Sequence, residues 1–291
     1  MSGPPQLRFW GVRGSIPAPG PQTARYGGNT PCVTLEVGGE PLIILDAGTG
    51  IRGLGAELAR RDQPFDAHLL LSHTHWDHIH GLPFLPGLYQ RRNRIMIHGP
   101  RPDQGSLRGV LEGLAAPPVF PISPSEWLAL AGIAEWDGAP VSLGGWRVGA
   151  CRLSHPGPTL GFRLARQGSP DVAYVTDNEL TGGVHGMEPG WRQKLIDFLR
   201  GAGVLIHDSA NAEDQVEFRR GWGHSSALQA LALAVEAECE KLVLFHHDPD
   251  RDDDALEAQF HETCRRAAMA SPAPKVEVAR EGLALTLERD G

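Results

Sequence analysis

The chain lacks most of the features that mark secreted and membrane-spanning proteins. Its 291 residues include only four cysteines, and no two of them form a Cys-x-x-Cys pair: Cys32, Cys151, Cys239 and Cys264. A disulfide framework is not expected in a chain of this size, and the four thiols are predicted to be small buried side chains. No apolar run approaches the roughly 18 residues of a membrane-spanning helix. The opening stretch MSGPPQLRFW has no basic segment followed by an apolar one, which a signal peptide would have, so we expect a cytoplasmic protein with no membrane partner.

The chain also lacks an excess of positive charge. Lys and Arg total 27 against 35 Asp and Glu, which gives a formal net charge of -8. Binding to long nucleic acid depends on many cations that displace phosphate counterions, so long nucleic acid is not expected as a partner. A small phosphorylated substrate stays compatible with this charge, because it needs only one or two local cations or metal ions.

What the chain does contain is a mixture of strand and helix patterns. Hydrophobic residues make up 41% and charged residues 21%, which is ordinary for a globular protein. The apolar run at residues 68–72 is typical of a buried strand, and residues 51–61 and 252–269 are predicted helices. Residues 100–126 hold six prolines around a short helix and are predicted to be a loop, a candidate wall of a site. We predict one domain over residues 1–291, with two sheets packed together and helices outside.

The most informative segment is the run Ser-His-Thr-His-Trp-Asp-His that ends the apolar strand. It places three imidazoles and a carboxylate within six residues: His73, His75, Asp77 and His78. Ending a buried strand in this way is costly unless a ligand satisfies the polar groups. A polar turn or a hydrogen-bonded histidine cluster is the alternative. In a loop, alternate residues point to different sides, so His73 and His75 are predicted to bind one metal ion and Asp77 and His78 a neighbouring one. Imidazole nitrogen and carboxylate oxygen suit Zn, Mn or Fe.

Further candidate ligands follow other predicted strands. His155 follows one strand, Asp177 ends a second, and His246 and His247 end a third. Each is weak evidence by itself, but their recurrence at strand ends indicates a shared site.

These residues, together with the hairpin that ends in Leu-Asp-Ala-Gly-Thr-Gly, resemble the metallo-β-lactamase superfamily from Phe9 to about Pro249. The resemblance implies an α/β fold, an αββα sandwich of two mixed sheets packed face to face with helices outside. It also implies a dinuclear metal site at one edge of the sheets. One metal ion would be held by His73, His75 and His155, and the second by Asp77, His78 and His246. Asp177 would bridge them, and His247 remains the alternative to His246.

Two further stretches resemble motifs of the tRNase Z-like phosphodiesterases. Ile-His-Asp-Ser at 206–209 and Gly-His-Ser-Ser at 223–226 resemble the paired His-Glu-Ala-Thr and His-Ser-Thr motifs. The resemblance implies that His224 acts at the phosphate and that Asp208 orients it, although this chain has the shorter Asp where the motif has Glu. An ordinary helix cap is the alternative for His224, and His207 is predicted to be structural.

One segment of the tRNA-processing relatives is missing. Those enzymes carry a long basic arm between the third histidine and the bridging aspartate, whereas only residues 156–176 lie between His155 and Asp177 here. The chain therefore looks more like the armless relatives that cleave small cyclic phosphodiesters. The resemblance also favours a homodimer over a monomer. Trp76 and Arg13 are candidates to line the pocket, although packing explains each equally well.

The expected function is hydrolysis of a small phosphodiester, cyclic ones included. Two adjacent divalent ions, Zn or Mn, can hold a bridging hydroxide and a phosphoryl oxygen. Asp77 would accept a proton from the nucleophile or orient it, and His224 would stabilise the phosphate or donate a proton to the leaving group. Hydrolysis of a thioester or lactone at the same metal site is the main alternative, but it does not need the pair of His224 and Asp208. A non-catalytic metal-binding or ligand-sensing protein is the other. Redox di-iron chemistry is disfavoured because such relatives usually have Glu in place of His75.

Overall fold

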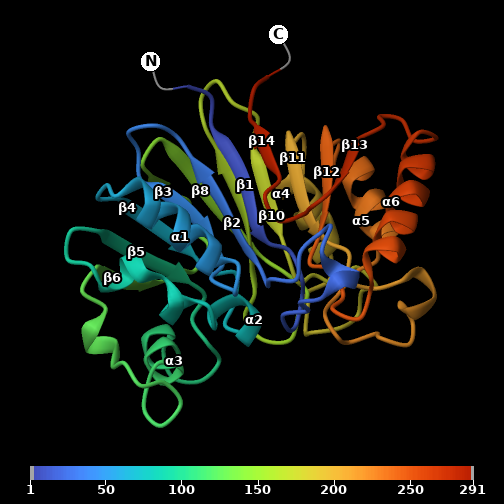
Figure 1. Cartoon of the computed structure of the whole chain (residues 1–291). Helices are drawn as coiled ribbons and strands as arrows, with labels where there is room; N and C mark the ends of the chain where they lie inside the picture. The colour runs from blue at the N-terminus through green and yellow to red at the C-terminus, as the bar shows by residue number, and fades with distance from the viewer. Residues whose placement is uncertain (1–2, 290–291) are drawn as a thin grey trace.

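Two seven-stranded sheets face each other, with the longer helices on their outer faces (Figure 1). The computed structural model describes residues 3–289. It confirms the αββα sandwich expected from the sequence. The four cysteines are free, but the expectation that all four are buried is wrong, because Cys151 and Cys264 are partly exposed. No helix within residues 3–289 has the length and apolar character needed to span a bilayer.

The first sheet contains most strands of the N-terminal half. Its strands, in spatial order, are β14 (Ala284–Thr286), β1 (Gln6–Gly11), β2 (Cys32–Glu36), β3 (Leu42–Leu45), β4 (Asp66–Leu70), β5 (Arg94–Gly99) and β6 (Leu130–Glu135). From β14 to β3 the neighbours are antiparallel, and from β3 to β6 they are parallel. The C-terminal strand β14 therefore pairs with the first strand of the chain.

The second sheet is also mixed. Its strands, in spatial order, are β13 (Lys275–Val278), β12 (Lys241–Phe245), β11 (Val204–Asp208), β10 (Val172–Val175), β9 (Leu160–Ala165), β8 (Trp146–Arg152) and β7 (Val141–Leu143). From β13 to β10 the strands are parallel, and the remaining pairs are antiparallel. The carboxyl ends of β10, β11 and β12 consequently meet at one edge of this sheet.

The described residues form six α-helices, of which the first and the last lie within two residues of the predicted ranges 51–61 and 252–269, whereas the second was not predicted. They are α1 (Ile51–Arg61), α2 (Trp76–Ile79), α3 (Leu107–Leu114), α4 (Trp191–Leu199), α5 (Ala227–Glu236) and α6 (Asp253–Ala267). Short 3₁₀ helices are η1 (Pro21–Thr23), η2 (Leu82–Phe84), η3 (Pro86–Tyr89), η4 (Pro124–Glu126) and η5 (Glu213–Gln215). The predicted loop at residues 100–126 contains α3 and η4, as its composition suggested.

Alternating side chains of the strands fill two kinds of core. Phe9, Tyr174 and Phe245 are fully buried between the sheets, and the ring centroid of Phe245 lies 6.0 Å from that of Phe9 and 5.6 Å from that of Tyr174. Successive residues of a strand face opposite sides, so Leu242 and Leu244 of β12 instead pack towards α4, α5 and α6. A similar outer core lies between the first sheet and α1 and α3.

Candidate metal centre

The candidate site lies at the edge of the sandwich where the parallel strands end, beside α2 (Figure 1). The motif that follows β4 is not only a loop, because α2 begins at Trp76 within it. Asp177 and His246 follow β10 and β12 with φ angles of 49° and 57°. A left-handed backbone costs a non-glycine residue about 1–2 kcal/mol, and such residues cluster at functional sites. Both strand ends are therefore held in costly conformations at the point where they supply a side chain.

One group of ligand-type side chains consists of three histidines. A ring nitrogen from each of His73, His75 and His155 lies within 4.8 Å of the other two. The Nε2 atom of His155 lies 3.0 Å from the Nδ1 atom of His75. Burial lowers the pKa of His155 to about 4 and also lowers the pKa of His73 and His75. All three rings are therefore neutral at neutral pH, which is the form that binds a metal ion.

A second group joins two carboxylates and two histidines. Ligand atoms of Asp77, His78, Asp177 and His246 lie within 4.8 Å of one another. The Oδ2 atom of Asp77 lies 3.1 Å from Nε2 of His78 and 3.2 Å from Nε2 of His246. These residues come from both sheets, so the group spans the two layers of the sandwich.

Asp177 lies between the two groups and directs one oxygen towards each. Its Oδ1 atom is 3.6 Å from Nε2 of His155 and 3.9 Å from Nε2 of His73. Its Oδ2 atom is 3.1 Å from Nε2 of both His78 and His246. This is the position that a carboxylate bridging two metal ions would need.

The residues present fit a pair of divalent cations. The Nε2 atom of His73 is buried and makes no hydrogen bond, which is costly for a polar atom without a ligand. Burial alone would lower the pKa of His78, but the carboxylates of Asp77, Asp177 and Asp46 raise it well above its usual value. Burial would raise the pKa of Asp77 and Asp177, yet the surrounding histidines hold both well below the usual range. The carboxylates of the second group therefore favour a positive charge among them, as a cation site should.

Asp46 supports the second group and is a residue that the sequence reasoning did not single out. Its Oδ2 atom accepts hydrogen bonds from Nδ1 of His78 and from the hydroxyl of Tyr174, each at 2.8 Å. Its Oδ1 atom accepts from the backbone N–H of Ser72 at 2.7 Å. Such a carboxylate fixes the ring orientation and tautomer of a metal-binding histidine. The available signal was a polar residue directly after the buried strand β3.

The structure places His246, and not His247, in the cluster. The Nε2 atom of His247 instead donates to the carbonyl of Ala279 at 2.9 Å. On the other side, Gly14 packs so close to the His246 ring that a Cβ there would lie 2.4 Å from it. The next residue, Ser15, donates its backbone N–H to Oδ2 of Asp77 at 2.8 Å, a contact with no clear sequence signal.

His224 and Asp208 also meet at this edge. The Nδ1 atom of His224 donates to Oδ2 of Asp208 at 2.7 Å, so the shorter carboxylate still reaches the ring. The same Nδ1 atom lies 4.0 Å from Oδ1 of Asp177. Burial lowers the pKa of His224, but the Asp208 carboxylate outweighs it and raises the pKa to about 9. His207 contacts Asn178 and the carbonyl of Asp208, in agreement with a structural role.

The other two residues predicted to line the pocket differ in their surroundings. Arg13 is fully buried and binds the carbonyls of Gly27 and Asp248 and the carboxylate of Asp253, so it holds loops together. The Trp76 side chain is 79% exposed beside the cluster. The ligand-type groups among the described residues include none from residues 100–126. That residues 100–126 form a wall of the site stays a prediction.

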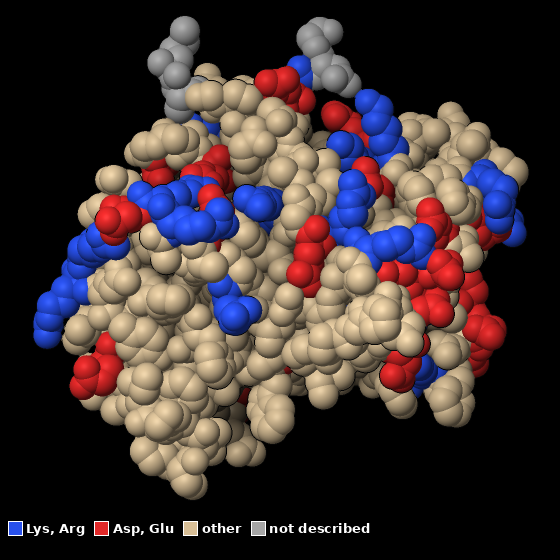
Figure 2. Space-filling model, viewed as in Figure 1, with Lys and Arg blue, Asp and Glu red and all other residues tan. Residues whose placement is uncertain are grey.

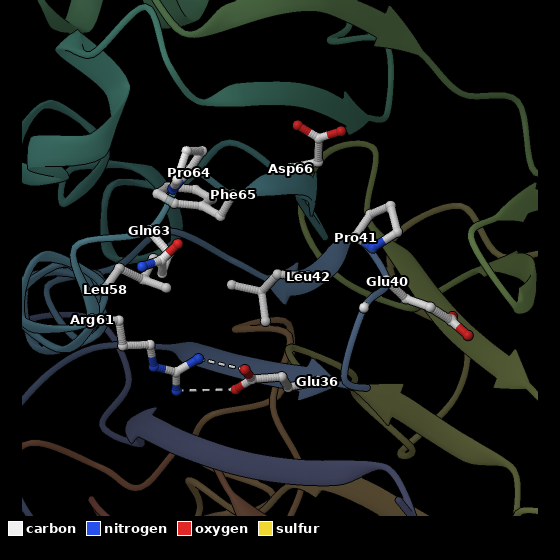
Figure 3. A pocket seen from close by; sticks show the side chains of 11 residues that line it. Glu36, Glu40, Pro41, Leu42, Leu58, Arg61, Gln63, Pro64, Phe65 and Asp66 are labelled. Carbon is white, nitrogen blue, oxygen red and sulfur yellow. Dashed lines mark hydrogen bonds and ion pairs between the residues drawn. The ribbon is translucent and has the colours of Figure 1, made fainter. Parts of the chain in front are cut away.

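A separate pocket of about 540 Å³ lies beside the first sheet, at the ends of its strands that are opposite to the metal cluster (Figure 3). It borders Leu42 and Asp66, which begin β3 and β4, whereas the metal cluster follows the ends of these strands. Arg61 forms an ion pair with Glu36 beside it, with 3.1 Å between Nη2 and Oε2. None of the cluster residues lines this pocket.

The two facing mixed sheets and the buried His/Asp cluster define a metallo-β-lactamase-fold hydrolase. The chain belongs to the β-lactamase superfamily, because the model of the Beta-lactamase superfamily domain matches residues 42–247. An uncharacterized protein of Mycobacterium leprae is 26% identical over 274 residues, covering 87% of this chain and 82% of that protein. Ribonuclease Z of Pyrococcus horikoshii is 27% identical over 267 residues, covering 76% and 81%. The crystal structure of a diphosphatase from the PhnP family superposes with a TM-score of 0.68, 18% identity and coverage of 98% of both chains, which shows a shared fold.

Proposed function

We propose that the protein hydrolyses small phosphodiesters, cyclic ones included, at a centre of two divalent cations, Zn or Mn. The observation that carries this proposal is the position of His224, held by Asp208 at 2.7 Å next to the bridging Asp177. The thiolate that leaves a thioester needs no proton from this second histidine, whereas the alkoxide that leaves a phosphodiester does. The names of two of the similar proteins, ribonuclease Z and a diphosphatase, agree with chemistry at phosphorus.

In this proposal each group of the cluster has a separate task. His73, His75 and His155 hold one cation, and Asp77, His78 and His246 hold the other, with Asp177 shared. When bound, the cations would lower the pKa of water to about 7 and neutralise charge on the phosphoryl oxygen.

Two side chains then handle protons. Asp77 orients the nucleophile and accepts its proton, while Ser15 fixes one carboxylate oxygen through its backbone N–H. His224 donates a proton to the leaving oxygen or stabilises charge on the phosphate.

Two features support a small substrate over long RNA. Residues 156–176 contain β9, a turn and β10, which leaves no room for an inserted arm between His155 and Asp177. On the face shown in Figure 2, Lys and Arg side chains lie among Asp and Glu side chains, and the lower part of that face, where α2 and α3 lie, is largely uncharged. That face offers no continuous basic track towards the site, as binding of a polyanion would require.

The test compares hydrolysis of bis(p-nitrophenyl) phosphate with that of the p-nitrophenyl monoester by protein loaded with Zn or Mn. We expect turnover of the diester that is abolished in Asp177→Ala and lowered at least about 10-fold in His224→Ala. His261→Ala, which removes an exposed histidine of α6, is the matched control and should keep full activity. Metal-loaded protein that cleaves neither ester would refute the proposal. Thioesters and lactones would then be assayed, and inactivity on those as well would leave a non-catalytic metal-binding role.

A further inference from the structure

Glu179 is a buried carboxylate that the proposed chemistry does not use directly. It lies two residues beyond Asp177, and only 1% of its surface is exposed. Its oxygens accept hydrogen bonds from the backbone N–H groups of Gly221 at 3.0 Å and Gly223 at 2.8 Å. The Thr181 hydroxyl and the His185 ring contact the same carboxylate, the latter at 3.1 Å.

A buried carboxylate is costly unless hydrogen-bond donors satisfy it. One segment satisfies both oxygens of Glu179, because the backbone N–H of Gly221 lies 3.0 Å from each of them and that of Gly223 lies 2.8 Å from Oε2. The carboxylate therefore holds the backbone of Gly221–Gly223 in place.

The loop held by Glu179 carries two groups of the metal centre. The carbonyl of Gly223 accepts a hydrogen bond from Nδ1 of His155 at 3.0 Å, which sets the tautomer that leaves Nε2 free to bind a metal ion. His224 is the next residue. A Cβ on Gly223 would lie 2.0 Å from the His155 ring, and its φ of 89° is left-handed, so the loop fits the ring closely.

The segment around Glu179 also contacts the histidine loops directly. The backbone N–H of Glu179 donates to the carbonyl of Ser154 at 2.8 Å. The Asn178 side chain accepts from the N–H of Ser154 at 3.1 Å, and the Asn178 carbonyl accepts from the Ser225 hydroxyl at 2.6 Å. One short segment after β10 therefore contacts the neighbours of both His155 and His224.

We infer that Glu179 is a positioning residue that sets His155 and His224 together through the backbone of Gly221–Gly223. This inference rests on the proposed function for the role of His224. Its effect on His155, and hence on metal binding, does not depend on the reaction.

The same loop provides a matched control. Arg219 forms an ion pair with Asp248 and lies over the Trp222 ring, but this pair does not contact the N–H groups of Gly221 and Gly223. Arg219→Ala should loosen the loop without removing the Glu179 contacts. A general loss of loop order would affect Arg219→Ala and Glu179 variants alike.

The kinetic test uses two diesters that differ only in the leaving group, methyl p-nitrophenyl phosphate and methyl phenyl phosphate. Phenoxide needs protonation more than p-nitrophenoxide, so misplacing an acid should affect the phenyl ester more. We expect Glu179→Ala to lower kcat/KM about 100-fold for the phenyl ester and about 10-fold or less for the nitrophenyl ester. Glu179→Asp, which keeps the charge but withdraws it from the glycines, should show the same direction and provides the test if the Ala variant does not fold. Glu179→Gln retains an acceptor for the glycine N–H groups, so the ratio of kcat/KM for the two esters should stay at the wild-type value.

A second readout is metal affinity, measured by chelator competition. Glu179→Ala should bind metal about 10- to 100-fold more weakly, as expected when the orientation of a ligand is lost, and Arg219→Ala should not. An unchanged ratio of the two esters in both the Ala and Asp variants, or an equal change in Arg219→Ala, overturns the inference. If the wild type cleaves neither ester, the proposed function fails, and weaker metal binding in Glu179→Ala alone still supports positioning of His155. Unchanged metal binding in that case overturns it.

Discussion

The Oδ2 atom of Asp177 lies 3.1 Å from Nε2 of His246, although 68 residues separate them in the chain. The sheet accounts for this contact. Asp177 follows β10 and His246 follows β12, with β11 between them, and all three strands run parallel. Both residues leave their strands with a left-handed backbone. The pair shows how the centre obtains its ligands, from strand ends brought to one edge.

Gly223→Ala should disrupt the centre through His155. The added Cβ would lie 2.0 Å from the His155 ring, and an L residue would also be strained at φ 89°. We expect loss of tight metal binding and a decrease in the free energy of unfolding of about 1–3 kcal/mol, measured by metal analysis and urea titration. Gly221→Ala has the same kind of strain, with φ 87°, but its Cβ meets nothing within 4 Å. Equal loss of metal in both variants would show that steric contact with His155 is not the cause.

Asp46→Asn should weaken metal binding without changing the size of the side chain. It removes the negative charge that accepts a hydrogen bond from Nδ1 of His78 at 2.8 Å. Loss of such a supporting carboxylate typically costs 10- to 100-fold in metal affinity or activity, and we expect a decrease in metal affinity of about this size. Chelator competition measures it. Asp66→Asn, at the exposed start of β4, should leave the affinity unchanged, and an unchanged affinity in Asp46→Asn would contradict the prediction.

Metal should stabilise the folded chain. The centre holds Asp77 and Asp177 close together among buried histidines, and a ligand that binds only the folded state stabilises it by RT ln(1 + [L]/Kd), about 2.7 kcal/mol at 100 times Kd. Removing metal with a chelator should therefore lower the Tm of the wild type. Asp177→Ala should show little further decrease on chelation. A wild-type Tm that does not respond to Zn, Mn or chelator would argue against the centre.

His98 should make the fold sensitive to mild acid. Burial lowers the pKa of His98 to about 4, and its Nε2 atom lies 3.1 Å from Nδ1 of His68. In the unfolded chain His98 binds a proton near pH 6.5, whereas in the folded chain it stays neutral to a lower pH. The titration of His98 therefore leaves the free energy of unfolding unchanged above pH 6.5 and decreases it as the pH falls towards 4. Because His98 is partly exposed, we expect a loss on the order of 1 kcal/mol between pH 7 and pH 5.

Urea unfolding of the wild type and His98→Asn at both pH values measures this loss. Titration of the metal centre cancels in the difference between the two chains. The variant should lose less stability on acidification than the wild type. An equal loss in both would show that His98 is not responsible.

Trp76→Ala tests whether this side chain contributes to substrate binding without contributing to the stability of the fold. Since the indole is 79% exposed, its removal should leave the Tm nearly unchanged. If Trp76 lines the mouth of the site, KM for diesters should rise several-fold with a smaller change in kcat, which steady-state kinetics would show. Met269→Ala removes a side chain that is 73% exposed beyond α6, and it should alter neither value.

The sequence was most informative where local pattern and chemistry coincide. Apolar strands that end in histidine or aspartate indicated both the sheets and the seven clustered residues. The edge strand β6 was missed because its Leu130–Glu135 sequence, with Gly and Ala, is partly exposed and has no strong alternation. Asp46 and Glu179 were also missed as supporting residues. Their roles depend on partners 32 and 44 positions away, His78 and Gly223, and no local pattern encodes such contacts.

The origin of the centre in both sheets has a consequence for synthesis of the protein. The first motif, His73 to His78, leaves the ribosome long before β10 and β12 exist, so an emerging chain has only part of each ligand group. The chain can therefore bind an ion tightly only after its second half has folded onto the first. Metal binding would then link the two sheets late in folding, and neither half of the chain expressed alone should retain the metal ion.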